Sequence, residues 1–288
     1  ALEYTKKCIH DLKKHFSGLN QEKARFEMVV FDDGSSDGTS EWLEQNHPDI
    51  HLLKGNGDLW WSGSVNRGSK FALEKLHCNY ILWWNNDILV HPGYFKNLQE
   101  IIKQSDTKTI WGSKIIDLGR GKTLWSMGGH FDPKSGRKDM VGRGSNNPDS
   151  FNEIIPADWF PGMGTLIPSN VFEKIGFVDE KNYPQYHGDS EFTYRANLAG
   201  FQLNAHPELV IYNDTTNTGN LHEDSFKNLI KTLREKKSLY NLGKDLKFYR
   251  QFATSPLAYR ELVIKYGKYT GRFFKWNLLK FLGIKKKP

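Results

Sequence analysis

Two hydrophobic periods alternate along residues 1–115, and no other feature of the sequence limits the possible folds as much. Short apolar runs at 26–31 and 80–84 end in turn-forming residues, as strands do, whereas residues 62–76 place their apolar side chains on one helical face. Parallel strands joined through helices produce this alternation. The sequence therefore predicts an α/β fold with a mainly parallel sheet covered by helices on both faces. The same pattern predicts further strands at 50–53 and 108–112 and further helices at the N-terminus, 39–46 and 92–102.

The pattern changes after Gly112. Residues 119–153 are rich in Gly, Asp, Asn, Ser and Lys, which predicts one strand followed by a long mobile loop. We expect residues 130–156 to form a lid over a binding crevice that becomes ordered when ligand binds. Compact structure is predicted to resume with helices at 169–175 and 189–199 and strands at 201–204 and 208–212.

Charge is distributed unevenly along the chain. Residues 221–288 contain 17 Lys and Arg against 5 Asp and Glu, whereas residues 1–220 contain 23 against 28. We therefore expect two parts: a folded domain over 1–220, and a basic, aromatic, helical region over 221–288. A general nucleic-acid-binding protein normally carries its basic surface on the folded domain, so we expect no nucleic-acid partner.

Cysteine usage and hydropathy bear on location. The two cysteines, Cys8 and Cys78, are too few for a disulfide framework, which favours a reducing, cytoplasmic compartment. No apolar run approaches the roughly 20 residues needed to span a bilayer. Residues 1–16 lack the apolar core of a signal peptide and instead predict an amphipathic helix.

Two acidic turns follow predicted strands. Asp32 and Asp33 follow the run at 26–31, and the sequence Asn85-Asn86-Asp87 follows the run at 80–84. Because ligands bind at the carboxyl ends of parallel strands, both turns are expected to face one crevice. A carboxylate such as Asp87 suits Mg²⁺ or Mn²⁺ bridging two phosphates. The alternative is a pair of structural turns capped by Asx side chains, with no ligand.

Two other motifs have competing interpretations. Residues 33–44 match the ligand spacing of an EF-hand calcium loop, but such a loop follows a helix and this one follows a strand. The Gly-rich segment 55–73 suggests dinucleotide binding, yet it lacks the full GxGxxG spacing. Asn66 and Arg67, near the start of the predicted helix, can instead reach a nucleotide diphosphate.

A third acidic motif and an aromatic motif lie later in the chain. In HGDSEF (187–192), Asp189 is either a helix N-cap or a carboxylate base facing the crevice. His187 is either a structural or a site residue. DWFPGMG (158–164) supplies aromatic surface and permissive glycine backbone close to the same edge.

The motifs DDGSSDGT, NRGSKFAL, NND, DWFPGMGTLIP and GDSEF occur in this order over residues 1–220. In this order they resemble the family-2 nucleotide-sugar glycosyltransferases of GT-A fold, and among them the bacterial polysaccharide rhamnosyltransferase-like enzymes. The resemblance implies an inverting transfer of a sugar from a UDP- or dTDP-linked donor to a hydroxyl of a glycan or lipid-linked acceptor. The implied setting is bacterial surface polysaccharide synthesis, with Mn²⁺ or Mg²⁺ as cofactor.

The resemblance also implies roles for individual residues. Asp32 would contact the nucleotide base with support from Asp33, Asp87 would hold the metal, and Asp189 would be the catalytic base. The other expected site residues are Trp61, Asn66, Asn85 and Asn86 for the nucleotide sugar, and Trp159, His187 and Glu191 for the acceptor.

Three departures from the family pattern keep an alternative open. We expect the family's first strand, with its nucleotide-contacting Thr or Tyr, to be missing from residues 1–288. The DxD metal motif has become NND, which removes one negative charge. A His expected in VIYNDTTNTG (210–219) is replaced by Tyr212 or Asn213. The alternative is therefore a nucleotide-sugar-binding protein with impaired catalysis.

The basic region has two interpretations of its own. Residues 221–288 contain twelve aromatic residues, which either pack a helical cap or place the stretch after Tyr259 on the inner face of the cytoplasmic membrane. In the second case basic side chains would meet anionic headgroups while apolar ones enter the interface. The expected interface residues are Phe273, Phe274, Trp276, Leu278, Leu279, Phe281 and Leu282, with Lys275, Lys280 and Lys285–Lys287 as the cations.

Overall fold

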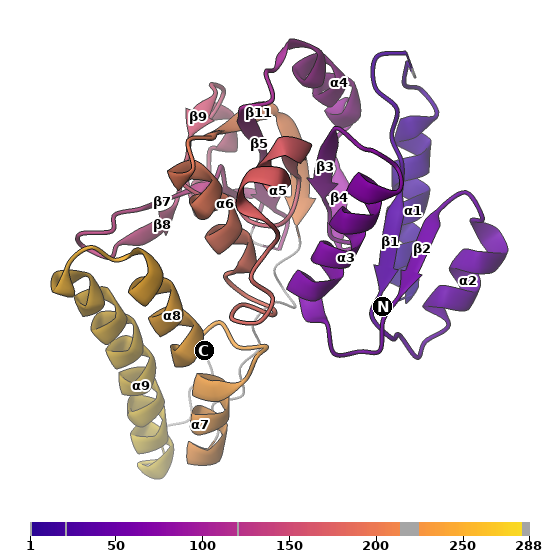
Figure 1. Cartoon of the computed structure of the whole chain (residues 1–288). Helices are drawn as coiled ribbons and strands as arrows, with labels where there is room; N and C mark the ends of the chain where they lie inside the picture. The colour runs from indigo at the N-terminus through magenta and orange to yellow at the C-terminus, as the bar shows by residue number, and fades with distance from the viewer. Residues whose placement is uncertain (1, 21, 120, 214–224, 284–288) are drawn as a thin grey trace. The chain divides into compact units, whose positions relative to one another are not determined.

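The computed structural model describes residues 2–20, 22–119, 121–213 and 225–283, and it divides into two compact units (Figure 1). The first unit comprises the described residues up to His130 and from Asp139 to Asn213. The second comprises Phe131–Lys138 and the described residues from Ser225 onward. The sequence pattern assigned residues 131–138 to the first part, and the structure groups them with the C-terminal helices.

The first unit contains a central sheet and a separate two-stranded sheet. The central sheet has the order β3 (Tyr80–Trp83), β10 (Thr165–Pro168), β5 (Thr109–Asp117), β11 (Gln202–Asn213) and β4 (Ile88–Val90). Two short strands extend it, β6 (Thr123–Ser126) beside β5 and β9 (Ile155–Pro156) beside β11. The separate sheet pairs β1 (Val29–Asp32) in parallel with β2 (His51–Lys54).

The α/β class is confirmed, but the strand pairing is mixed rather than mainly parallel. β5 and β11 run parallel, whereas β10 runs antiparallel to β3 and β5, and β4 runs antiparallel to β11. The reason is visible where β10 begins. The N–H of Gly164 donates to the carbonyl of Trp83 at the end of β3, so β10 must run back along its neighbour. Hydrophobic periodicity carries no information on strand direction.

Helices cover both faces of the central sheet (Figure 1). On one face, α3 (Trp60–Glu74), α5 (Ser169–Ile175) and α6 (Gly188–Leu198) pack against the sheet through residues such as Ala72, Phe172 and Phe192. On the other face, α1 (Leu2–Phe16) and α4 (Tyr94–Gln104) contribute Leu12 and Leu98 to a second cluster. The helix α2 (Thr39–Asn46) packs against the β1–β2 pair through Leu43.

Local sequence explains these elements well. In α4, Tyr94, Phe95, Leu98 and Ile101 recur at helical spacing and are all buried, and Gly93 permits the left-handed turn (φ 92°) from which the helix begins. β3 is apolar on both faces, because a strand between two helical layers has no solvent-facing side.

The segment between β6 and β9 corrects the prediction of a long mobile loop. It contains the paired strands β7 (Gly129–Phe131) and β8 (Lys138–Met140), followed by a 3-10 turn at Pro148–Ser150. Phe131 is only 3% exposed and packs edge-on against Phe248, with ring centroids 5.1 Å apart. Phe131 is a single apolar residue in a polar segment, and its ring contact with Phe248 is one of the contacts that hold the tip of the hairpin. Ordering of a lid on ligand binding stays a prediction.

The second unit is built from α7 (Phe226–Arg234), α8 (Leu242–Phe252) and α9 (Tyr259–Phe281). Inside it, the carboxylate of Asp245 accepts hydrogen bonds from Lys265 Nζ at 2.6 Å and from the Tyr266 hydroxyl at 2.8 Å. Tyr240 and Tyr269 stack with ring centroids 4.1 Å apart. These contacts tie α8 and the turn before it to the middle of α9.

Over the described ranges, no helix combines the length and the apolar character needed to cross a bilayer.

Candidate active site

A cavity of about 1030 Å³ lies in the first unit beside the carboxyl ends of β1 and β3. Most of its wall is apolar, but one end is lined by the two acidic turns. Six of the residues expected to bind the nucleotide sugar or the metal line this cavity. They are Asp32, Asp33, Trp61, Asn85, Asn86 and Asp87.

Asp32 lies at the end of β1 and is held by its own turn. Its carboxylate accepts hydrogen bonds from the Ser35 N–H at 3.0 Å and from the Ser40 hydroxyl. Burial alone would raise the pKa of Asp32, but these hydrogen bonds outweigh it and lower the pKa. Asp32 is therefore an ionised, pre-oriented acceptor, as recognition of a base N–H group requires.

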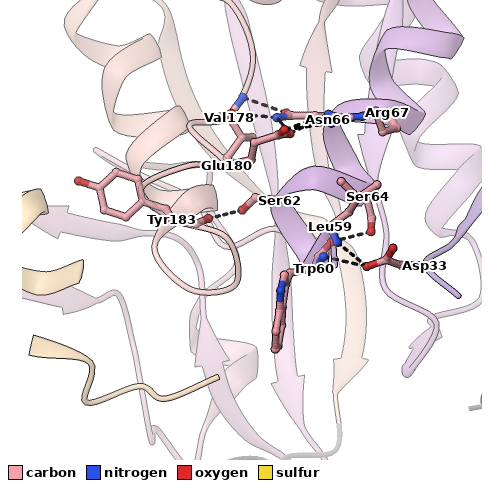
Figure 2. Close-up of polar contacts among 10 residues, drawn as sticks. All are labelled: Asp33, Leu59, Trp60, Ser62, Ser64, Asn66, Arg67, Val178, Glu180 and Tyr183. Carbon is pink, nitrogen blue, oxygen red and sulfur yellow. Dashed lines mark hydrogen bonds and ion pairs between the residues drawn. The ribbon is translucent and has the colours of Figure 1, made fainter. Parts of the chain in front are cut away.

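Asp33 anchors the start of α3 (Figure 2). Its two carboxylate oxygens accept from the N–H groups of Gly57, Leu59 and Trp60, each at 2.9 Å. These amides belong to the Gly-rich loop and the first helical turn, whose N–H groups have no partner within the helix. Asp33 therefore fixes the start of α3 beside the cavity.

Asn85, Asn86 and Asp87 follow β3 and point to different partners. Asn85 Oδ1 accepts from Trp61 Nε1 at 3.1 Å, and Asn86 Nδ2 donates to Thr5 Oγ1 at 2.9 Å. Asp87 is exposed at the cavity rim, yet partial desolvation by the surrounding protein raises the pKa of its carboxyl group. A cation bound at this carboxylate would stabilise its charged form and so offset the cost of its partial desolvation.

Asp189, the expected base, is connected to the cavity through Gly162. The Gly162 N–H donates to Asp189 Oδ2 at 2.9 Å, and the Ser190 N–H donates to Oδ1 at 2.7 Å. The Cα of Gly162 faces the Trp61 indole so closely that an added Cβ would lie 2.0 Å from Cζ2. The contacts thus run from Asp189 through Gly162 and Trp61 to Asn85.

Two residues beside this path have left-handed backbone although neither is glycine. Trp60 has φ 58° and His187 has φ 71°. Non-glycine residues adopt this conformation only when their surroundings impose it, and such residues concentrate at functional sites. His187 immediately precedes α6 and is partly buried, with its ring 6.5 Å from that of Tyr183.

Asn66 is buried and hydrogen-bonded to the segment 178–180, and its expected role in nucleotide binding stays a prediction. Its Nδ2 donates to the Val178 carbonyl at 2.9 Å and to Glu180 Oε2 at 2.8 Å, and its Oδ1 accepts from the Val178 N–H at 3.0 Å (Figure 2). Arg67 also pairs with Glu180, at 2.8 Å. These contacts of the Asn66 amide hold residues 178–180 against α3.

Trp159 and Glu191 are likewise buried rather than available to an acceptor. Trp159 is 4% exposed and donates from Nε1 to the His130 carbonyl at 3.3 Å. Glu191 is 1% exposed, and its carboxylate accepts from Arg195 Nε at 2.8 Å, one helical turn along α6. Sequence pattern identifies such residues as polar or aromatic but does not reveal that tertiary packing has already engaged them.

The expected metal site can be tested against the residues present. Within the described ranges, no three His, Cys, Asp or Glu side chains gather as a metal-binding group. Mg²⁺, however, is commonly held by one or two carboxylates together with waters and substrate phosphates. Asp87, exposed at the rim of a large cavity, fits this shared mode of binding. Tyr212 and Asn213 lie at the end of β11, and the rest of that motif, 214–219, is outside the described residues.

Sequence reasoning missed three residues that organise the site. They are Gly162, Glu180 and Gln185, whose Oε1 accepts from the Trp61 N–H at 3.2 Å. Only Gly162 carried a signal, because it lies in the aromatic and Gly-rich motif FPGMG. Glu180 and Gln185 act across more than 110 positions of sequence, which no local pattern reports.

Comparison with known proteins now identifies the family. A family model described as glycosyl transferase family 2 matches residues 2–160, more than half of the chain. The chain belongs to glycosyl transferase family 2.

This family 2 chain is 27% identical over 190 residues to the low-salt glycan biosynthesis hexosyltransferase Agl10 of Haloferax volcanii, covering 66% of this chain and 58% of that protein. It is 26% identical over 95 residues to an uncharacterized protein of Methanocaldococcus jannaschii, covering 32% and 42% respectively. It therefore spans about half the length of these relatives.

Solved structures show the fold of the family 2 chain. GalNAc-T7, crystallised with UDP, GalNAc and Mn²⁺, aligns with a TM-score of 0.57 at 14% identity, covering 93% of this chain and 55% of that chain. The mannosyltransferase PcManGT from Pyrobaculum calidifontis, in complex with GDP-Man and Mn²⁺, aligns with a TM-score of 0.54 at 12% identity, covering 90% and 64%. The GT-A fold expected for the family 2 chain is confirmed.

Proposed function

We propose that this protein transfers a hexosyl group, with inversion, from a nucleoside-diphosphate donor to a hydroxyl of a glycan or lipid-linked acceptor. The observation that carries the proposal is the contact path from Asp189 through Gly162 and Trp61 to Asn85. It fixes a carboxylate beside the same edge at which the two acidic turns line the large cavity. Membership of family 2 and the hexosyltransferase among the relatives support the reaction class.

The residues have distinct roles in the proposed reaction. Asp189 accepts the proton of the acceptor hydroxyl while its oxygen forms a bond to the anomeric carbon. The bond from that carbon to the donor diphosphate breaks on the opposite face, which inverts the anomeric configuration. A divalent cation held by Asp87 would neutralise the charge that develops on the departing diphosphate. Because the Gly162 and Ser190 amides hold both carboxylate oxygens, Asp189 keeps one orientation throughout.

Donor recognition is assigned to the other end of the cavity wall. Asp32 would accept a hydrogen bond from the nucleotide base, and Asn85 and Asn86 would contact the ribose or the diphosphate. Trp61 would contact the donor through its aromatic ring. We propose a UDP- or dTDP-linked hexose or deoxyhexose as donor and bacterial surface polysaccharide as the product. The motif order supports this setting. The GT-A neighbours were crystallised with UDP or GDP-Man and with Mn²⁺, which supports a nucleotide donor and a divalent metal.

The test is turnover of Asp189→Asn against a panel of nucleotide sugars with Mn²⁺ and acceptor present. We expect kcat to fall by at least about 100-fold, the lower end for loss of a general base, while the donor Kd from calorimetry changes little. The matched control is Glu173→Gln, since Glu173 is an exposed carboxylate on α5. Wild-type turnover in the Asp189 variant would refute the assignment.

A non-catalytic nucleotide-sugar-binding protein is the second candidate. The observation in its favour is that, within the described ranges, no group of three His, Cys, Asp or Glu side chains that could hold a metal includes Asp87. Calorimetry with and without Mn²⁺, combined with a donor-hydrolysis assay, separates the two candidates. Tight donor binding with no sugar release or transfer would favour the second candidate over the first.

The exposed face of α9 supports a membrane-associated acceptor. Phe274, Leu278, Phe281 and Leu282 are each at least 58% exposed and recur at helical spacing. Exposed cations flank them, including Lys268, Arg272 and Lys275. Such a face fits an anionic bilayer surface, where each cation contributes about 1 kcal/mol. We propose a peripheral contact with the inner face of the cytoplasmic membrane.

The structure also corrects part of the expected membrane face. Phe273 is 4% exposed and packs with Leu229 and Tyr269 inside the second unit, so it cannot enter a bilayer. Lys285–Lys287 lie outside the described residues. Deleting residues 270–288 would remove Phe273 from the buried cluster of the second unit, so point substitutions are the better test.

The membrane proposal is tested by vesicle sedimentation of a variant with Phe274, Leu278 and Phe281 replaced by Ser. Wild type should bind vesicles containing phosphatidylserine and dissociate as salt rises, because screening weakens the cationic contribution. The variant should bind at least tenfold more weakly. Leu257→Ser, at a residue 73% exposed outside α9, is the control. Equal sedimentation of wild type and the triple variant would contradict the proposal.

A further inference from the structure

The first turn of α3 makes an unusual set of main-chain hydrogen bonds. A helix leaves its first four N–H groups without partners inside the helix. In α3 each of these groups has an acceptor from elsewhere in the chain. They are the N–H groups of Leu59, Trp60, Trp61 and Ser62. The turn is therefore engaged by other parts of the protein along its whole length.

The acceptors come from two places in the first unit. The first two amides bond to the carboxylate of Asp33, in the acidic turn after β1. For the other two, Gln185 Oε1 accepts from the Trp61 N–H at 3.2 Å, and the Pro184 carbonyl accepts from the Ser62 N–H at 2.9 Å. One helical turn thus bonds both to the acidic turn that lines the cavity and to the chain just before α6.

Ser62 is the fully buried centre of this junction. Its hydroxyl donates to the Tyr183 carbonyl at 2.5 Å (Figure 2). A Cβ added to Gly188 would lie 2.4 Å from Ser62 Oγ, so the chain passes the serine at a distance that leaves no room for a side chain. Gly188 is the first residue of α6 and directly precedes Asp189.

The same segment is also held at its other end (Figure 2). Asn66, one turn further along α3, donates to the Val178 carbonyl at 2.9 Å and accepts from the Val178 N–H at 3.0 Å. Residues 178–188 are therefore fixed to α3 at both ends. His187, with its left-handed backbone (φ 71°), lies next to the second fixed point, where its surroundings can impose that conformation.

We propose that Ser62 and Gln185 are positioning residues for Asp189, an inference that rests on the role of Asp189 as base in the proposed function. Asp189 lies in the first turn of α6 and accepts from the Gly162 N–H at 2.9 Å. The start of α6 rests on Ser62 through Gly188. Neither Ser62 nor Gln185 needs to touch a reactant, because each acts on Asp189 through the chain that precedes it.

Amide hydrogen exchange, measured by NMR on the whole chain, tests the positioning without any turnover. In Ser62→Ala we expect the Gly162 N–H to exchange at least tenfold faster, because its acceptor Asp189 is held less firmly. The N–H of Ile110, a fully buried residue of β5, should exchange as in wild type. This pair of amides separates local loosening from general destabilisation.

Matched variants make the result specific. Ser64→Ala removes a hydroxyl that donates to the Trp60 carbonyl within α3, at 2.5 Å, so exchange at Gly162 should stay as in wild type (Figure 2). Gln185→Met removes the acceptor of the Trp61 N–H, whereas Gln185→Glu keeps an acceptor oxygen. Only the Met variant should accelerate exchange at Gly162.

A double variant tests the contact between Ser62 and Gly188. Gly188→Ala alone should accelerate exchange at Gly162, although alanine is the better helix former, because its Cβ meets Ser62 Oγ. Ser62→Ala removes the obstructing oxygen. The double variant should therefore accelerate exchange by less than the product of the two single factors, as expected for residues in contact.

Turnover separates this inference from the proposed function. For Ser62→Ala we expect kcat to fall at least about tenfold, since misplacing a catalytic group is costly, while the donor Kd changes less than twofold. Wild-type turnover in Asp189→Asn would refute the proposed function, and exchange at Gly162 would still decide the positioning. Wild-type kcat in Ser62→Ala, with Asp189→Asn inactive, would overturn this inference alone. So would wild-type exchange at Gly162 in both Ser62→Ala and Gln185→Met, or equal acceleration at Ile110.

Discussion

The N–H of Gly162 donates to Oδ2 of Asp189 at 2.9 Å, while the Cα of the same glycine lies against the Trp61 ring. One residue without a side chain therefore contacts both the proposed base and a residue that lines the cavity proposed to hold the donor. Any side chain at this position must displace one of the two.

The Gly162→Ala variant tests this relationship. Its Cβ would lie 2.0 Å from Trp61 Cζ2, so the indole must move and its bond to Asn85 must break. We expect a loss of about 1–3 kcal/mol in the free energy of unfolding, typical of overpacking, and weaker donor binding by calorimetry. Gly18→Ala, which meets no atom within 4 Å, should leave both unchanged.

Asp33→Ala should destabilise the start of α3, because three backbone N–H groups lose their acceptor. The expected cost is about 1–2 kcal/mol by urea unfolding, the range for loss of a helix cap. Asp33→Asn keeps one acceptor oxygen and should cost less. The exposed Asp58 serves as a control, and an Asp33→Ala variant as stable as Asp58→Ala would contradict the capping role.

Stability should depend on pH through Glu180. Burial opposes ionisation of this carboxyl group, but hydrogen bonds from Arg67 and Asn66 outweigh that effect and lower its pKa. A depressed folded pKa contributes stability that is present above the unfolded value of about 4.3 and lost as pH falls through the folded value. The Tm of Glu180→Gln should therefore lie below wild type near pH 7 and approach it near pH 3. A Tm difference that is constant over this range would show that ionisation of Glu180 is not involved.

Phe131→Ala should destabilise the second unit. The Phe131 ring is 3% exposed and contacts Phe248 and Tyr249, so its removal leaves a cavity that costs about 3–5 kcal/mol. Limited proteolysis should then cleave the C-terminal helices faster. Leu257→Ala, at a residue 73% exposed, should be cleaved like wild type.

The two acidic turns were predictable because each follows a short apolar run: β1 ends at Asp32, and β3 ends at Trp83, shortly before Asp87. The helix ranges could also be predicted, since the helix expected at 39–46 has the same bounds as α2. The direction of the strands could not be predicted, because the antiparallel course of β10 depends on where the loop before it returns to the sheet.

Residue roles inside the site were harder to predict than its position. Asn66 and Glu191 have the chemistry of ligand-binding groups, but their partners Val178 and Arg195 become known only once the chain has folded. The same limit applies to Phe131, a single apolar residue in a polar segment, whose importance comes from Phe248 more than a hundred positions away.

Residues 131–138 belong to the second unit, although the rest of that unit lies at the C-terminal end of the sequence. The second unit is therefore not one continuous stretch of the chain. A recombination event that exchanged only the C-terminal helices would separate Tyr249 from the carbonyl of Gly136, to which its hydroxyl donates. It would also leave the Pro133 carbonyl without the Thr254 N–H. The hairpin tip and the C-terminal helices must therefore be inherited together, so drift in one constrains the other during evolution.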